Sequence, residues 1–136
     1  MLRGSQSEIN ARLAEAESDA GRVLSLLQGM ANQPGEMDEQ VQARKGKMTA
    51  DAHFALGMVA LMQENSAKAI EEFASAIKSV PNPIPQYYFR LGDAYSSSGK
   101  TAEAIESFTK AGELGKGTVM EQLANKRIAE LRERKP

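Results

Sequence analysis

The 136-residue sequence has no cysteine, no tryptophan and a single histidine, His53. The absence of cysteine excludes disulfide bonds and thiolate metal sites. One histidine is too few for a histidine-based metal site or a histidine-containing catalytic triad within one chain. His53 itself is expected to be a packing residue rather than a general base. The sequence therefore predicts no metal site and no cofactor.

Long apolar runs are also missing. No segment approaches the roughly 20 apolar residues that cross a bilayer, and the printed sequence does not begin with the apolar stretch of a signal peptide. We therefore expect no membrane insertion and a cytoplasmic location. Charges nearly balance, with 17 basic and 18 acidic residues and a formal net charge of −1. Such a balance gives no general attraction to nucleic acid or to an anionic membrane.

A cluster of basic residues near the C-terminus is the strongest candidate for a nucleic-acid surface. Glu130 and Glu133 lie among these basic residues, which is typical of the solvated side of a helix. We therefore expect no nucleic-acid partner. The cluster comprises Lys126, Arg127, Arg132, Arg134 and Lys135.

The tetrapeptide 98–101, Ser-Gly-Lys-Thr, resembles the end of a nucleotide-binding phosphate loop. That motif requires a further glycine five residues before the Gly-Lys pair and a preceding strand, whereas this sequence has Ala94 there and a helical pattern before it. The adjacent carboxylates of Glu71 and Glu72 are expected on the solvent face of a helix. We therefore predict that the protein is not an enzyme.

Residues 50–116 contain one pattern twice, offset by 35 residues. In each copy, small and apolar residues recur at spacings of three and four, the periodicity of a helix buried on one side. Polar turns at 63–66 and 97–101 divide each copy into two such stretches, so each copy predicts a helical hairpin. Six of eight equivalent pairs match in identity or in aromatic or apolar character. The pairs are His53 and Tyr88, Leu56 and Leu91, Gly57 and Gly92, Ala60 and Tyr95, Ala69 and Ala104, Phe73 and Phe108, Ala76 and Ala111, and Pro81 and Lys116.

The two hairpins are expected to stack, because one hairpin alone cannot bury its apolar face. Glycine and alanine at the shared positions let helix backbones approach closely, and Phe73 and Phe108 fill the space between neighbouring helices. Ser66 and Thr101 are placed to cap the second helix of each hairpin. Pro85 is placed to open the second hairpin after a proline-rich connection.

The repeated residues resemble the tetratricopeptide repeat family, whose pattern is W-x2-L-G-x2-Y, then A-x3-F, A and P, over about 34 residues. The first copy, 50–84, has His53 and Ala60 at the aromatic positions but keeps Pro81. The resemblance implies an all-α fold of stacked antiparallel helical hairpins, a solenoid that usually binds other proteins. The second copy, 85–116, matches best and reads Tyr88-x2-Leu91-Gly92-x2-Tyr95, then Ala104-x3-Phe108-x2-Ala111.

The segment before the repeats, residues 1–49, is expected to be helical. The spacing Ser5-x-x-Glu8 is a capping box, which predicts a long helix over about 5–31. The sequence Asn-Gln-Pro-Gly at 32–35 then breaks the helix.

The long helix has an apolar seam with alternating steps of four and three, which leaves two alternatives open. The seam can pair with another copy in a coiled coil, or it can dock on the repeat stack, which the extra Leu24 and Leu26 favour by widening it. Residues 36–47 have few apolar side chains and predict a short, mobile helix or linker. Together with the long helix they are also interpretable as a degenerate first repeat. The seam comprises Ile9, Leu13, Ala16, Ala20, Val23, Leu27 and Met30.

Residues 117–136 are expected to form a C-terminal helix that caps the stack, with a polar outer side and a frayed tail. Gly115 and Gly117 end the second hairpin, and the helix is expected over Thr118–Arg134. Its predicted apolar face comprises Met120, Leu123, Ala124, Ile128 and Leu131.

The resemblance also implies a binding site, because the first helix of each repeat lines the concave side in this family. The function predicted is protein–protein interaction through a peptide segment held in that groove. The alternative is an oligomerising structural scaffold assembled through the N-terminal helix. A family subgroup that binds chaperone C-termini has Lys and Asn where this chain has Phe54 and Met58, so that ligand is not expected. The candidate residues are Asp51, Phe54, Met58, Leu61, Met62, Gln86, Phe89, Arg90, Asp93 and Ser97, with Glu121 and Asn125 closing the far end.

Overall fold

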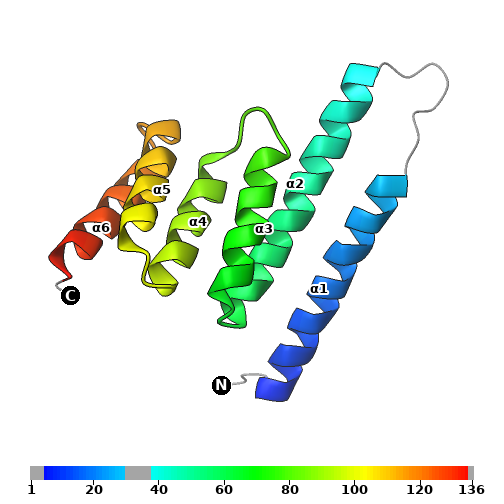
Figure 1. Cartoon of the computed structure of the whole chain (residues 1–136), viewed down its shortest axis with the longest axis horizontal. Helices are drawn as coiled ribbons and strands as arrows, with labels where there is room; N and C mark the ends of the chain where they lie inside the picture. Colours follow the sequence, from blue (N-terminus) through cyan, green and yellow to red (C-terminus); the bar gives the residue numbers. More distant parts are fainter. Residues whose placement is uncertain (1–4, 30–37, 135–136) are drawn as a thin grey trace.

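The computed structural model of the chain describes residues 5–29 and 38–134, and all regular secondary structure in these residues is helical. The predicted all-α fold is therefore confirmed. No helix in the described part of the chain has the length and apolar character needed to cross a membrane. The helices, shown in Figure 1, are α1 (Gln6–Gly29), α2 (Asp38–Met62), α3 (Ser66–Lys78), α4 (Pro85–Ser97), α5 (Thr101–Leu114) and α6 (Val119–Glu133).

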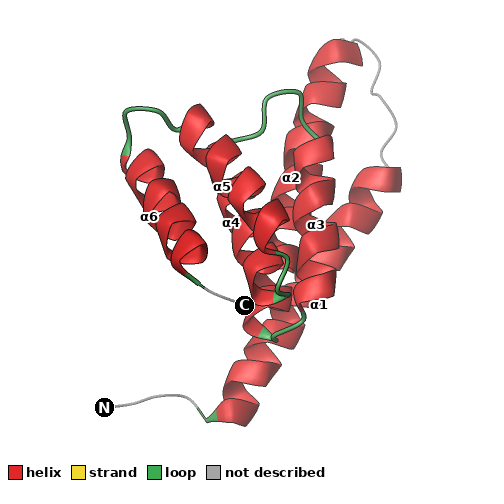
Figure 2. Ribbon diagram, turned by 60° about the vertical axis from the view of Figure 1, so that its left-hand side comes forward, coloured by secondary structure: helices red, strands yellow, loops and turns green. Residues whose placement is uncertain are grey.

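The helices form two rows. Each helix packs against the next in the chain, so α2–α3 and α4–α5 are the two predicted hairpins. The backbone of α4 also approaches those of α2 and α6, whereas the backbone of α3 approaches neither α1 nor α5. Because one row is more closely spaced than the other, the stack curves toward the closer row. We call α2, α4 and α6 the inner row, and α1, α3 and α5 the outer row (Figure 2).

Two phenylalanines fill the centres of the hairpins, as the sequence predicts. Phe73 and Phe108 are the largest fully buried side chains in the described residues. Each ring lies against a glycine of the preceding helix. A Cβ atom on Gly57 would lie 2.5 Å from Phe73, and one on Gly92 would lie 2.7 Å from Phe108. The glycines are therefore required by close approach of a ring.

The turns inside the hairpins differ from the expected capping. Ser66 and Thr101 are the first residues of α3 and α5, not their N-caps. Asn65 caps α3, and its side chain accepts a hydrogen bond from the backbone N–H of Lys68 at 3.2 Å. Lys100 stands at the equivalent position before α5 and makes no side-chain cap. The prediction was wrong by one residue in both turns, because serine and threonine were preferred over their neighbours.

The helix ends of the second repeat and of α6 follow from local sequence signals. Pro85 opens α4, and Gly115 is the C-cap of α5. The hydroxyl of Thr118 caps α6 by accepting a hydrogen bond from the N–H of Met120 at 3.2 Å. The buried residues of α6 are Ala124, Ile128 and Leu131. Leu123, which was expected on the same face, is exposed instead.

The expected short helix or linker over 36–47 differs from the structure, where residues 38–47 are the first turns of α2. Val41 anchors these turns, since its side chain is buried. Gly46 does not interrupt the helix because it permits a close contact: a Cβ atom there would lie 2.6 Å from the carbonyl oxygen of Ser79. The proposed division between residues 49 and 50 therefore falls inside one continuous helix. The breaker at 32–35 lies outside the described residues.

The N-terminal helix docks on the first repeat. The capping box is confirmed, since Ser5 and Glu8 exchange hydrogen bonds of 3.1 and 3.2 Å between side chain and backbone. Along the seam, Ala20 and Leu27 are buried while Ile9 is exposed. α1 packs along α2. The C-terminal half of the seam is thus used within the chain, as one of the two alternatives expected.

Candidate functional site

The predicted site residues come mainly from two neighbouring helices of the inner row. Their spacing of three and four places each set on one side of its helix, and α2 and α4 touch. The α2 set is Asp51, Phe54, Met58, Leu61 and Met62, and the α4 set is Gln86, Phe89, Arg90, Asp93 and Ser97.

Aromatic packing and one hydrogen bond join α2 to α4. The ring centroid of Phe54 lies 5.1 Å from that of Tyr87 and 5.5 Å from that of Phe73. The hydroxyl of Tyr87 donates a hydrogen bond to Oδ1 of Asp51 at 3.3 Å. Burial, and then the negative charge of Asp51 and this hydrogen bond, raise the pKa of Tyr87 above its ordinary value. Two of the predicted residues, Asp51 and Phe54, thus join α2 to α4.

Most of the apolar patch predicted on α2 is used in packing. Phe54, Met58 and Leu61 are half-buried against the core that fills the space between α2, α3 and α4. Met62 is different, because 63% of its surface is exposed. Met62 is therefore the apolar side chain of this set that another molecule reaches without displacing a neighbour.

Phe89 was expected to line an open groove, but only 5% of its surface is exposed. Its ring meets Phe108 edge to face, with centroids 5.2 Å apart. The cluster that encloses it includes Ala124 and Ile128 of α6. Phe89 is therefore a core residue, because the C-terminal helix covers it.

A charged cluster joins α4 to α6 above Phe89. Nη1 of Arg127 lies 2.6 Å from Oδ1 of Asp93, and Nη1 of Arg90 lies 3.1 Å from Oδ2. The two guanidinium groups lie 5.2 and 5.8 Å from the centroid of the Phe89 ring, within the range of cation–π interaction. Burial raises the pKa of Asp93, although the two arginines act to lower it.

Arg127 is the residue of this cluster that the sequence analysis assigned differently. It was grouped with the basic residues on the solvated side of the last helix, because nothing local distinguishes it from Lys126. Its pairing with Asp93 depends on where α6 crosses α4. The two partners are 34 residues apart, so the sequence alone does not indicate that they pair.

The structure does not bring Glu121 and Asn125 to the site on α2 and α4. They line a separate cavity of about 530 Å³ between α5 and α6, together with Gly112 and Arg132. The carboxylate of Glu121 accepts a hydrogen bond from the backbone N–H of Gly117 at 3.2 Å. The expectation that both residues close the far end of one groove therefore differs from the geometry.

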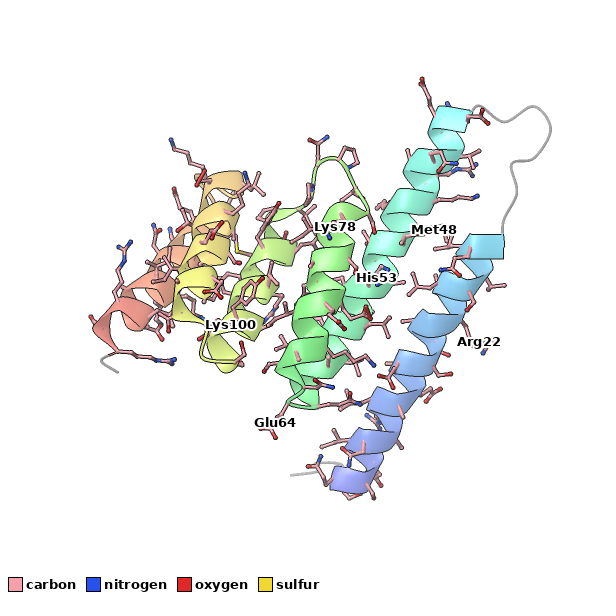
Figure 3. All side chains as sticks on the ribbon, viewed as in Figure 1. Arg22, Met48, His53, Glu64, Lys78 and Lys100 are labelled. Carbon is pink, nitrogen blue, oxygen red and sulfur yellow. The ribbon has the colours of Figure 1, made fainter. Side chains whose placement is uncertain are left out.

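His53 lies on the side of α2 that faces α1, away from the predicted site (Figure 3). Its side chain has a partner on α3. Its Nδ1 lies 3.1 Å from Oε1 of Glu72, and both side chains are largely buried. Glu72 was expected on a solvent face, which is wrong, because its side chain is largely buried against His53 of α2. Within residues 5–29 and 38–134, no group of histidine, aspartate and glutamate side chains is arranged to hold a metal ion.

Comparison with known proteins identifies one part of the chain. The tetratricopeptide repeat family model matches residues 85–114, which comprise α4 and α5. A search of curated proteins found no match. The predicted family is therefore supported by the second repeat, and the first repeat shares its pattern at an offset of 35 residues. Protein interaction is the usual role of this repeat.

Proposed function

We propose that this protein is an interaction module that binds a peptide segment of a partner protein across the inner row of helices. The main support is the α4–α6 junction. Arg90 and Arg127 share the single carboxylate of Asp93, and their side chains remain 40% and 44% exposed. Two guanidinium groups against one carboxylate leave a positive charge that suits an acidic group of a ligand.

An apolar contact accompanies this charge on the neighbouring helix. Met62 is exposed, and the half-buried Met58 and Leu61 lie on the same side of α2. Methionine adapts to varied shapes at binding surfaces. The ligand we propose is therefore an extended or helical segment with an apolar anchor and an acidic residue. Gln86 and Ser97, both exposed on α4, supply hydrogen-bonding groups beside it.

The experiment compares the partners captured from a cell extract by the wild type and by three variants. Met62→Glu and Arg90→Glu change the proposed site, and Met48→Glu changes another exposed methionine elsewhere on α2. We expect the same proteins to be lost with the first two variants and kept with the control, while the helical circular dichroism spectrum stays unchanged. Equal capture by all four proteins would show that the inner row is not the site.

The second candidate is a scaffold that oligomerises through the N-terminal helix. It is favoured by Leu26, which lies exposed on α1 although it is a large apolar side chain. Ile9 on the same helix is also exposed. Sedimentation equilibrium over a range of concentrations tests this function. A species that stays at the 14.7 kDa monomer mass would rule it out, whereas a dimer that Leu26→Glu dissociates would establish it.

A further inference from the structure

A cavity of about 620 Å³ opens between α4 and α5, on the side of α4 that faces away from the inner-row site. Its floor is formed on α4 by Tyr88 and Tyr95 around Leu91, and its wall is formed by α5. These α4 residues are displaced by about half a helix circumference from Arg90 and Asp93. α3 packs on α4 but its backbone does not approach α5. Leu91 is buried against the core shared by α2, α3 and α4, so the accessible part of the floor is formed by the half-buried Tyr88 and Tyr95.

The wall carries unpaired negative charge. Glu103, Glu106 and Glu113 line the cavity, and none of them has an ion-pair partner among the described residues. Lys110 is the basic residue on the same wall. The formal charge of these four side chains is therefore −2, three acidic minus one basic. A ligand of positive charge is favoured.

Ser107 is a second and independent sign that the cavity takes a ligand. Its surface is only 6% exposed, and its side chain lines the cavity. Its hydroxyl has no hydrogen-bond partner in the part of the chain that the structure describes, although it is not sealed away from the cavity. Because this hydroxyl opens on the cavity, a polar group that enters the cavity can form a hydrogen bond with it.

In the first repeat, the side chains at the equivalent positions have hydrogen-bond and ion-pair partners. With the offset of 35 residues, Tyr88 and Ser107 correspond to His53 and Glu72, which bond to each other at 3.1 Å. Glu103 corresponds to Lys68. Nζ of Lys68 donates to Oε2 of Glu17 at 2.6 Å, and Glu17 belongs to α1. In the first repeat all three positions thus have partners: His53 of α2 and Glu72 of α3 bond to each other, and α1 supplies the partner of Lys68.

In the second repeat the side chains at the same three positions have no hydrogen-bond or ion-pair partner among the described residues. The charge at the position of Lys68 is reversed, because Glu103 stands there. We propose that this cavity binds a basic segment of another protein. A lysine or arginine of the segment pairs with Glu103 as Glu17 pairs with Lys68, and its N–H groups donate to Ser107. The faces of Tyr88 and Tyr95 attract the same cations through their π-systems. This surface is separate from the inner-row site and does not depend on it.

The test uses a synthetic peptide of about 12 residues made of lysine, alanine and leucine, and a counterpart with glutamate in place of lysine. This length covers the ~15 Å of α5 between Glu103 and Glu113. Because the chain has no cysteine, the substitution Thr109→Cys places one fluorescent label at the cavity. Ala14→Cys on α1 places the label elsewhere. We expect titration with the lysine peptide to change the fluorescence of the first protein only, and to weaken with added salt.

A charge-matched pair of variants identifies the surface. Glu103→Lys, Glu106→Lys and Glu113→Lys together should weaken binding of the lysine peptide about tenfold or more, because the wall then repels the peptide instead of attracting it. The control reverses the same number of exposed charges at Glu15, Glu130 and Glu133, and should retain the affinity. Melting curves of both triple variants verify folding, and Ser107→Ala gives a milder change if one of them is unstable.

Three results would overturn the proposal. Equal affinity for the lysine and glutamate peptides would exclude a site for a basic segment. Equal loss in both triple variants would show a general charge effect without a defined surface. Self-association of the wild type that disappears in the Glu103, Glu106 and Glu113 variant would assign the cavity to a second copy of this chain. Met62→Glu should leave peptide binding unchanged, which distinguishes failure here from failure of the inner-row site.

Discussion

Phe108 occupies the space that a side chain on Gly92 would need. A Cβ atom at Gly92 would lie 2.7, 2.8 and 2.9 Å from three ring atoms of Phe108, distances that side chains do not tolerate. Because Phe108 is held on all sides by the buried cluster around α5 and α6, the ring cannot move aside. The glycine on α4 and the phenylalanine on α5 therefore form one unit.

Gly92→Ala should destabilise the protein by about 1–3 kcal/mol, the usual cost of overpacking a core. Urea denaturation measures the change in the free energy of unfolding. Gly21→Ala on α1 is the matched control, because a Cβ atom there meets nothing within 4 Å and alanine is the better helix former. The control should be stabilised by roughly 0.5–1 kcal/mol. Destabilisation of both variants to the same extent would contradict the assignment of the effect to Phe108.

Phe108→Ala should cost about 3–5 kcal/mol, because it removes a buried ring and leaves a cavity. The same denaturation experiment measures it. In the background of Phe108→Leu, which leaves a smaller side chain, Gly92→Ala should be less harmful than in the wild type. Additive losses in that double variant would mean that the two residues act independently.

Each hairpin turn should become more stable when it receives a residue that the other turn contains. Glu64 has φ of 60°, where its counterpart in the second repeat is Gly99 with φ of 79°. Glu64→Gly should relieve about 1 kcal/mol of backbone strain. Lys100→Asn should add the cap that Asn65 gives to α3, a gain of typically ~1 kcal/mol. Both variants should melt at a higher temperature, and an unchanged melt for Lys100→Asn would show that no cap forms there.

Tyr87 should make stability fall at alkaline pH. Its folded-state pKa is raised above the ordinary 10.0 by burial and by Asp51. The folded state therefore holds the phenol proton more tightly than the unfolded state. This contribution to stability is complete below about pH 10 and is lost as the pH rises through the folded-state pKa. Tyr87→Phe removes it, so the free energy advantage of the wild type over this variant should shrink as the pH rises above about 10 in denaturant titrations. A free energy difference between the two proteins that does not change with pH would contradict the link between Tyr87 ionisation and stability.

The features predicted correctly from the sequence depend on local spacing. The repeat core follows from Gly and Phe at fixed intervals within one hairpin, and Pro85 and Gly115 act through their own backbone preferences. Contacts within a hairpin are close in sequence. The pattern that forms them is therefore visible in one stretch of the chain.

The features missed depend on where one helix crosses another. Phe89 became a core residue because α6 lies on it, and Arg127 became a site residue for the same reason. Residues 36–47 were expected to form a short helix or linker because few of their side chains are apolar, yet Gly46 lets the carbonyl of Ser79 approach α2. Each outcome is set by two elements brought together from distant parts of the chain, and neither element's own sequence specifies the crossing.

α2 is one continuous helix that includes both the residues before the first repeat and the first helix of that repeat. α2 has 25 residues, about 38 Å of helix, and in Figure 1 it extends past the end of α3. α1 runs beside it. The first turns of α2, residues 38–47, continue without interruption into the turns that bear Asp51 and Phe54. Because α1 packs along α2 and α2 touches α4, we expect a displacement of α1 to change the orientation of α2 relative to α4.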